Sequence, residues 1–325
     1  MSDASHVYIT RPLPDQVLAP FEDQLPVPLQ IHHRAEFPPN REELLAGVSG
    51  AVGVLSMVTD RIDGEVLDAA GDQLKIVANM GVGYDNIDLD AAAERSVVVT
   101  NTPGVLDETV ADLALALILA TVRRVAEGDR FIRTGKEWIW GPQEYVGLDV
   151  SAGAVLGIVG LGRIGMATAR RAAAFGMRIL ATGSRADSEE ARELGVQPAG
   201  LDELLASSDV VSLHCPLKPE THHLIGADQL AAMKPGSYLI NTARGPLVDE
   251  EALADALEAG HLAGAGLDVH EHEPQVNQRL ARRENVVVLP HIGSAGDVTR
   301  RRMATLALEN LTAVLGGKAP ITPVG

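Results

Sequence analysis

The sequence lacks the features of secreted and membrane-spanning proteins. It has one cysteine, Cys215, so no disulfide can form within the chain, which is typical of a reducing compartment. The first ten residues, MSDASHVYIT, lack the basic and then apolar pattern of a secretory signal. The longest apolar run, LALALILATV at 113–122, is too short to span a bilayer. We therefore expect a soluble, cytoplasmic protein.

Positive charge and aromatic side chains are also scarce. The 27 Lys and Arg residues face 44 Asp and Glu residues, giving a formal net charge of −17. A chain this acidic repels phosphate backbones, which argues against nucleic acid as a major partner. Aromatic residues make up 3% of the chain while glycine occurs 32 times, a balance that suits close packing of helices on strands.

Two series of short β-branched runs alternate with helical patterns along the 325 residues. The first series predicts strands at 6–10, 27–33, 51–56, 74–79 and 96–102, with helices at 41–48 and 63–71. The second predicts strands at 154–160, 177–183, 209–216, 237–243, 262–269 and 285–291. This alternation favours parallel strands with helical crossovers, and therefore an α/β fold with two doubly wound sheets.

Two long helical patterns frame the second series, at 108–135 and 295–317. The simplest arrangement joins both chain ends in one domain, 1–102 plus 291–325, and inserts a second domain, 103–290, between them. The framing helices would then act as hinges.

A glycine-rich turn opens the second series. Gly160-Leu161-Gly162-Arg163-Ile164-Gly165 follows an apolar strand and begins an alanine-rich helix, which is the context that a dinucleotide-binding G-x-G-x-x-G turn requires. The first glycine permits a tight turn, the second lets a pyrophosphate approach the backbone, and the third lets the helix pack against the strand. The helix N-terminus then faces the anion. The turn predicts a dinucleotide site.

Several blocks resemble the D-2-hydroxyacid dehydrogenase family. They are INTARGPLVDEEAL (240–253), GAGLDVHEHEP (264–274), VVVLPHIGSA (286–295), VANMGVGYDNIDL (77–89) and TNTPGVLDETVADLALALIL (100–119). Together they cover most of the chain from about residue 50 to 315, in order, and the pattern is closest to the glyoxylate and hydroxypyruvate reductases. The resemblance implies a flavodoxin-like substrate domain, a Rossmann dinucleotide-binding domain and a homodimer.

The resemblance implies three active-site residues, and their chemistry fits. Arg244 can hold a 2-keto acid's carboxylate and polarise its carbonyl with paired hydrogen bonds. His291 has the intrinsic pKa of a general acid near neutral pH, and Glu273 would stabilise its protonated form. His291 would be the acid in reduction and the base in oxidation.

The resemblance also assigns residues around the ligands. For the substrate these are Leu55, Ser56, Val82, Gly83 and Ser294, with Val82 and Gly83 offering backbone N–H groups. For the cofactor they are the glycine turn together with Thr109, Cys215, Pro216, Thr242, Asp268 and Gly293; Asp268 would accept a hydrogen bond from the nicotinamide carboxamide.

Two segments leave alternatives open. HEHE at 270–273 has the spacing of an acidic turn or of a metal site, although the family needs no metal and we expect none; His270 and His272 could instead shift the pH profile. Trp138 and Trp140 lie in 135–145, a loop that reaches a partner's active site in such reductases, or else packs under the first hinge helix.

The strand end in LATGSRADSEE (180–190) lacks the carboxylate that NAD-binding proteins place there. Gly183 lies about where that acid belongs, and the first carboxylate, Asp187, comes beyond the strand. Ser184 and Arg185 can instead bind a 2′-phosphate. We expect NADP(H) to be preferred, with NAD(H) possible if Arg185 points into solvent.

The sequence therefore predicts an NADPH-preferring reductase of glyoxylate or hydroxypyruvate. Two alternatives stay open: an NAD-using enzyme like 3-phosphoglycerate dehydrogenase, and a dinucleotide-sensing scaffold like the corepressors that share the fold and keep the Arg-Glu-His set. No nucleic-acid or membrane partner is expected.

Overall fold

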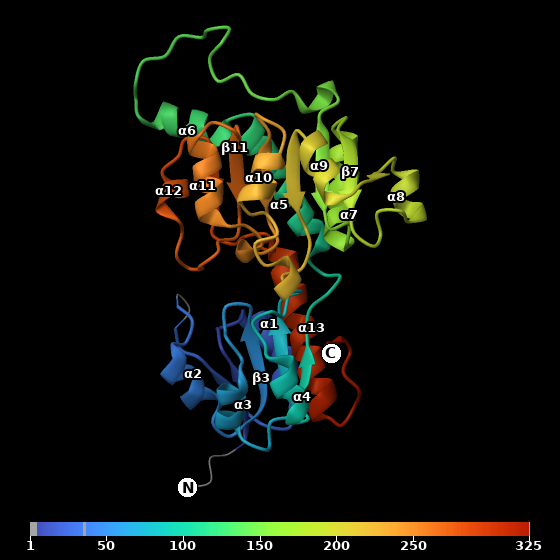
Figure 1. The fold of residues 1–325 in the computed structure, drawn as a ribbon. Coiled ribbons are helices and arrows are strands. Elements are labelled where there is room, and N and C mark those ends of the chain that lie inside the picture. Colours follow the sequence, from blue (N-terminus) through green and yellow to red (C-terminus); the bar gives the residue numbers. More distant parts are fainter. Residues whose placement is uncertain (1–4, 35–36, 325) are drawn as a thin grey trace. The chain divides into compact units, whose positions relative to one another are not determined.

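The computed structural model describes residues 5–34 and 37–324 (Figure 1). The chain forms two compact units, Met1–Leu106 with Gly296–Gly325, and Asp107–Ala295. The sequence-based division was 1–102 plus 291–325, so the observed boundaries lie a few residues further along the chain at both crossings. Residues 291–293 stay with the second unit because their backbone is hydrogen-bonded to Asp268.

The first unit is built on a parallel sheet in the strand order of flavodoxin-like folds. Its strands are β1 (His6–Ile9), β2 (Leu29–Ile31), β3 (Ala51–Met57), β4 (Ile76–Met80) and β5 (Val98–Thr100). They lie in the order β5-β4-β3-β1-β2. A two-residue strand, β13 (Pro323–Val324), adds antiparallel to β5. Nothing in the sequence pattern predicted β13, because two residues carry no periodicity.

Helices α1 (Asp15–Glu22), α2 (Arg41–Val48), α3 (Gly64–Ala70), α4 (Leu89–Glu94) and α13 (Asp297–Leu315) complete this unit. Side chains cap three of them: Asn40 before α2, Asp63 before α3 and Asp88 before α4 each accept a first-turn backbone N–H. Helix α13 packs on β3 and β4. Its position confirms the second predicted framing helix, with Gly296 at the N-cap.

The second unit holds the Rossmann order with one added strand. Its parallel strands are β6 (Val155–Val159), β7 (Arg178–Thr182), β8 (Gln197–Pro198), β9 (Val210–Leu213), β10 (Tyr238–Asn241), β11 (Gly264–Leu267) and β12 (Val286–Val288). The order is β12-β11-β10-β9-β6-β7-β8. In this order β8 is the third strand and β12 the added seventh. All six predicted strands are present, and the pattern did not reveal the two-residue β8. The predicted α/β, doubly wound fold class is confirmed.

Helices on both faces of this sheet are α5 (Asp107–Val122), α6 (Val125–Arg133), α7 (Arg163–Ala174), α8 (Glu189–Glu193), α9 (Leu201–Ser207), α10 (Ala227–Ala232), α11 (Glu250–Glu258) and α12 (Gln278–Ala281), with single 3-10 turns η1 (Val150–Ala152), η2 (Pro219–Thr221) and η3 (Gly245–Leu247). The apolar faces of these helices and strands form two buried clusters, one on each side of the sheet. Because the strands are parallel, their carboxyl ends share one edge, where the candidate site lies.

The prediction of one helix over 108–135 was wrong. The chain breaks at Arg124, which takes a left-handed conformation at φ 55° and donates from Nε and Nη2 to the Glu127 carboxylate. The carbonyl of Val122 accepts from the Leu148 backbone instead of continuing the helix. The side-chain pattern of 108–135 is helical on both sides of this break, so periodicity alone did not reveal it. In the described residues no helix is long and apolar enough to cross a membrane.

Candidate active site and cofactor site

The glycine turn adopts the geometry that its sequence predicts. Gly160 has φ +96°, and a Cβ there would lie 2.6 Å from the backbone nitrogen of Cys215. A Cβ on Gly165 would lie 2.4 Å from the Gly160 oxygen, whereas one on Gly162 would meet open space. The turn therefore needs glycine at positions 160 and 165 for packing. It leaves Gly162 open on the side where a pyrophosphate would approach.

Backbone hydrogen bonds decide which N–H groups of the turn remain for an anion. Gly160 and Leu161 both donate to the Thr182 carbonyl, at 3.1 and 3.0 Å, and Leu161 is buried. Helix α7 begins at Arg163 with no side-chain cap. The N–H groups of Arg163 and Ile164 have no preceding helical turn to accept them, so they are available to an anion.

Cys215 and Pro216 follow β9 and lie beside the turn. The backbone of Cys215 contacts Gly160, and burial raises the pKa of the Cys215 thiol to about 11. A thiol with so high a pKa is not a nucleophile at neutral pH. The preceding His214 bonds to the Ser212 hydroxyl at 2.8 Å, and burial lowers its pKa to about 4, so this imidazole is neutral.

The end of β7 carries no carboxylate. Gly183 has φ +116°, which L side chains rarely adopt, and a Cβ there would lie 3.2 Å from the Leu161 nitrogen. Ser184 is exposed, and Arg185 pairs with Glu190 of α8 at 2.7 Å. A hollow of about 380 Å³ lies beside them, lined in part by Gly183, Ser184 and Asp187.

His291 and Glu273 form a hydrogen-bonded pair. The Nδ1 atom of His291 lies 2.9 Å from Glu273 Oε2, and the His270 backbone donates to Glu273 Oε1 at 3.0 Å. Burial tends to raise the pKa of Glu273, but the hydrogen bonds and charge of His291 outweigh it, so the pKa lies below its usual value. The carboxylate is therefore ionised at neutral pH, and Nε2 of His291 is left for a ligand.

Asp268 fixes the backbone that carries His291. This fully buried carboxylate accepts from the N–H groups of Ile292 and Gly293, both at 2.8 Å, and the His291 N–H donates to the Asp268 carbonyl at 2.8 Å. His291 has φ 54°, a left-handed conformation that costs a non-glycine residue roughly 1–3 kcal/mol. The three hydrogen bonds hold this segment in place against that cost.

Arg244 stands on a loop that Asn241 organises. The buried Asn241 side chain donates to the Arg244 carbonyl at 2.8 Å and accepts from the Ala243 N–H at 3.0 Å. Gly245 then packs against the next segment so closely that a Cβ would lie 1.9 Å from the His270 carbonyl carbon. The loop of Arg244 and the segment of Glu273 are therefore in direct backbone contact.

Comparison with known proteins decides the family. Residues 115–293 match the model of the D-isomer specific 2-hydroxyacid dehydrogenase, NAD binding domain. The chain is 48% identical over 316 residues to a glyoxylate reductase of Korarchaeum cryptofilum, covering 97% of this chain and 94% of that one. The chain belongs to the D-2-hydroxyacid dehydrogenase family.

Solved structures resemble the fold of this chain along nearly its whole length. A protein from Thermus thermophilus is 50% identical, with a TM-score of 0.90 over 98% of this chain and 100% of that chain. The NADPH-dependent glyoxylate/hydroxypyruvate reductase of Sinorhizobium meliloti, in complex with NADP and malonate, is 35% identical, with a TM-score of 0.85 over 99% of this chain and 97% of that one. This D-2-hydroxyacid dehydrogenase is thus an NAD(P)-dependent enzyme, and its cofactor is a nicotinamide dinucleotide.

The residues of this dehydrogenase fit such a cofactor. The Thr242 hydroxyl oxygen, at the end of β10, is buried with no protein partner, as expected of an atom that a ligand satisfies. Gly293 is buried beside Asp268, and a Cβ there would lie 3.2 Å from Asp268 Oδ2. Thr109 lies inside the first turn of α5, and Ser294 follows Gly293.

The expected substrate residues of the first unit lie at the carboxyl ends of β3 and β4. Leu55 and Ser56 are buried in β3. The carbonyls of Val82 and Gly83 accept from two asparagine side chains, Asn101 and Asn79, both at 2.8 Å. These two hydrogen bonds hold the Val82–Gly83 loop in place.

The geometry bears on two open alternatives of the sequence. Three side chains of the HEHE segment have separate partners: His270 bonds to Leu289, Glu271 to His223 and Glu273 to His291. Among the described residues, these side chains do not form a group that could hold a metal ion. Trp138 and Trp140 are 62% and 78% exposed, on the long loop that leaves α6 in Figure 1, so they do not pack under the hinge helix.

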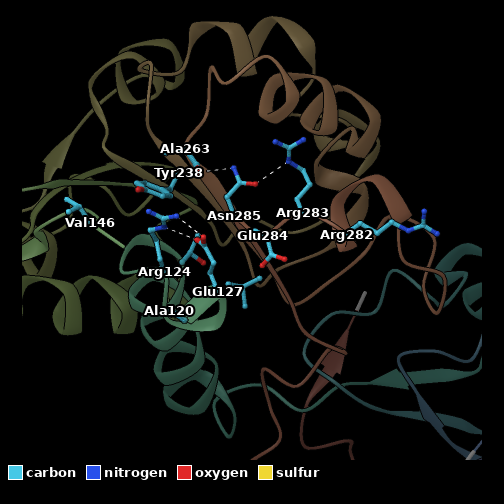
Figure 2. A pocket seen from close by; sticks show the side chains of 12 residues that line it. Ala120, Arg124, Glu127, Val146, Tyr238, Ala263, Arg282, Arg283, Glu284 and Asn285 are labelled. Atoms are coloured by element: carbon cyan, nitrogen blue, oxygen red, sulfur yellow. Dashed lines mark hydrogen bonds and ion pairs between the residues drawn. The ribbon is translucent and has the colours of Figure 1, made fainter. Parts of the chain in front are cut away.

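A larger hollow, of about 590 Å³, has the lining shown in Figure 2. Tyr238, Ala263 and Asn285 mark its position at the amino ends of β10, β11 and β12, opposite the edge of the candidate site. Arg124 is turned onto Glu127, and Arg283 bonds to Asn285. Because of this position, we do not assign the active site to this hollow.

Proposed function

We propose that this dehydrogenase reduces glyoxylate or hydroxypyruvate to the corresponding 2-hydroxy acid and prefers NADPH. The His291–Glu273 pair beside the Arg244 loop carries the proposal, because it offers a proton donor and a carboxylate clamp at one edge of the sheet. Relatives named glyoxylate reductase, 45–48% identical over nearly the whole chain, support this substrate class.

The proposed chemistry divides the work among three side chains. The guanidinium of Arg244 binds the substrate carboxylate and polarises the adjacent carbonyl, which the fork geometry of arginine suits. The bound dinucleotide supplies the hydride. His291 gives its Nε2 proton to the carbonyl oxygen, and Glu273 stabilises the imidazolium before this transfer. The neutral imidazole then takes a proton from water, and oxidation reverses each transfer.

We assign the remaining ligand contacts on the same basis. The Arg163 and Ile164 N–H groups would hold the pyrophosphate, Thr242 and Asp268 would lie at the nicotinamide end, and the Val82–Gly83 loop of the first unit would receive the substrate carboxylate. The unit Asp107–Ala295 then binds cofactor and the other unit binds substrate.

The strand end of β7 supports the NADPH preference. A left-handed glycine at position 183 excludes the usual carboxylate, whose charge would repel a 2′-phosphate. The side chains available there are Ser184 and Arg185. Arg185 is partly exposed and its ion pair with Glu190 lies at the surface, so it can turn onto a phosphate without uncovering a buried charge.

We further propose a homodimer in which the loop of Trp138, Ile139 and Trp140 contacts the partner. Ile139 is 90% exposed, and three adjacent large apolar side chains in water disfavour a free loop. With one cysteine in the chain, we also keep the expectation of a cytoplasmic location.

Turnover of a keto-acid panel with NADPH and with NADH tests the proposal. We expect glyoxylate and hydroxypyruvate to give the highest kcat/KM, with NADPH ahead of NADH. Faster turnover of 3-phosphohydroxypyruvate with NADH would support the phosphoglycerate dehydrogenase alternative. Cofactor binding without turnover of any keto acid would support the sensing scaffold.

A further inference from the structure

His270 is a buried histidine behind the proposed catalytic pair. It follows β11, its exposed fraction is 5%, and its Nε2 lies 2.9 Å from the Leu289 carbonyl oxygen. A carbonyl only accepts, so Nε2 carries a hydrogen and donates it. Leu289 precedes His291 by two residues, so the ring of His270 joins the segment after β11 to the segment after β12.

The same residue touches the two other parts of the proposed site. Its backbone N–H donates to Glu273 Oε1 at 3.0 Å, and its carbonyl group is the surface on which Gly245, next to Arg244, packs. One buried residue thus contacts the three segments that carry Arg244, Glu273 and His291.

Acidic groups surround the ring. Glu250, buried at the start of α11, lies 3.8 Å from Nδ1 of His270, beyond hydrogen-bond length, and Nδ1 has no other partner among the described residues. Glu250 is held by Glu271, since each accepts a hydrogen bond from the other's backbone N–H. The interaction with Glu250, followed by the hydrogen bond to Leu289 and the charge of Glu273, outweighs burial and raises the pKa of His270.

We propose that His270 is a positioning residue for the His291–Glu273 pair: its donated hydrogen bond to the Leu289 carbonyl sets the spacing between the ends of β11 and β12, and so aligns His291 Nδ1 with the Glu273 carboxylate. Only the predicted effect of His270 on turnover rests on the proposed function. The alignment of His291 with Glu273 is a property of the free protein.

Two substitutions separate the hydrogen bond from the charge. His270→Gln removes the charge but keeps an N–H donor of similar reach, whereas His270→Phe keeps the bulk and loses both. The difference between the variants therefore isolates the hydrogen bond to Leu289. His270→Met, a flexible apolar replacement, serves if the phenylalanine variant does not fold.

The first measurement is an NMR spectrum of the His291 ring in the free protein. A ring N–H that is hydrogen-bonded to a carboxylate gives a low-field proton signal, so this signal should be present in His270→Gln and lost in His270→Phe. This result does not depend on any substrate. The same low-field signal in both variants would overturn the proposal.

The second measurement is turnover, once the wild type is active on a keto acid. We expect kcat to fall roughly tenfold in His270→Phe, with KM changed little, and to recover largely in His270→Gln, since misalignment of a general acid acts on the chemical step. Wild-type kcat in His270→Phe, or a His270→Gln variant as slow as it, would contradict the proposal. An inactive wild type would count against the proposed function and leave the NMR result to decide on His270.

His261→Phe is the matched control. The His261 ring also bonds to a backbone carbonyl, that of Met233 at 3.0 Å, in the same unit but after α11 rather than at the catalytic edge. We expect this variant to lower Tm without changing kcat or the low-field signal of the His291 ring. An equal loss of kcat in both phenylalanine variants would show a general loss of structure instead of positioning.

Discussion

In the sheet of the second unit, the carboxyl ends of β11 and β12 hold their side chains differently from the carboxyl end of β7. At the ends of β11 and β12, buried residues hold the segments of the proposed acid and its partner: Asp268 binds the backbone of 291–293, and the His270 backbone donates to Glu273. At the end of β7, Arg185 is partly exposed and pairs with Glu190, an exposed glutamate.

The difference matches what each end is proposed to do. Proton transfer needs fixed distances, and a general acid displaced by an ångström loses much of its effect, so buried and overlapping hydrogen bonds suit it. Choosing between a ribose hydroxyl and a phosphate needs only local charge and room, which exposed side chains supply. Substitutions at the first end should therefore change rate strongly, and those at the second should change cofactor preference modestly.

The largest effect should come from His291→Ala. Losing a general acid lowers kcat by a factor of roughly a hundred or more, while the affinity for NADPH should stay nearly unchanged. Steady-state kinetics and a fluorescence titration of NADPH measure the two quantities. His222→Ala, which removes a histidine outside the pair, should behave as wild type. Turnover of His291→Ala at the wild-type rate would refute the proposed acid.

Asp268→Asn should be the next most damaging change. An amide nitrogen in place of one carboxylate oxygen would face a backbone N–H of Ile292 or Gly293, and one lost charge-assisted hydrogen bond of this kind is worth about 1.5–3 kcal/mol. We expect a lower Tm by calorimetry and a kcat reduced roughly ten- to a hundredfold, because the left-handed backbone at His291 loses its support. An unchanged Tm would mean that Asp268 does not hold this segment.

Acid pH should weaken the Glu273–His291 pair. The pKa of Glu273 is lower in the folded protein than its ordinary value of about 4.5, so its contribution to stability is present above that pH and is lost as pH falls through the native pKa. The Tm difference between wild type and Glu273→Gln should therefore be largest near pH 6 and shrink toward pH 3. A difference that stays constant over this range would contradict the depressed pKa.

The catalytic end was also the more predictable from sequence. The strand pattern and the glycine turn revealed the fold class, and the resemblance pointed to Arg244, Glu273 and His291. The organising residues behind them were missed. Glu250 accepts a hydrogen bond from the backbone of another segment, and Asn241 bonds to backbone groups of its own loop, and neither contact follows from the strand and helix pattern. The break at Arg124 was missed for the same reason, since it depends on Leu148 binding the end of α5.

Arg185→Ala should lower kcat/KM with NADPH by about tenfold and leave NADH nearly unaffected, because one charge-assisted contact to phosphate is lost. Shifting the preference toward NADH requires a substitution at a residue other than Arg185. A carboxylate at Gly183 itself would be strained, because φ +116° disfavours any side chain there. Ser184→Asp places the carboxylate on the next residue and should shift preference toward NADH. Indifference of the wild type to loss of Arg185 would refute the phosphate contact.

The smallest effect should come from Glu190→Gln, and its sign is the informative part. Glu190 accepts from Arg185 at 2.7 Å and from Arg170 at 3.0 Å, so in the free enzyme it holds the proposed phosphate ligand on a carboxylate. If Arg185 must leave Glu190 to bind NADPH, the substitution removes a competitor and a negative charge, and the KM for NADPH should fall about two- to threefold, an effect that salt reduces. Glu193→Gln, one turn further along the same exposed helix, is the matched control and should leave both cofactors unchanged. A higher KM for NADPH in Glu190→Gln would mean that the ion pair presents Arg185 to the phosphate, and the β7 end would then be preorganised like the catalytic end.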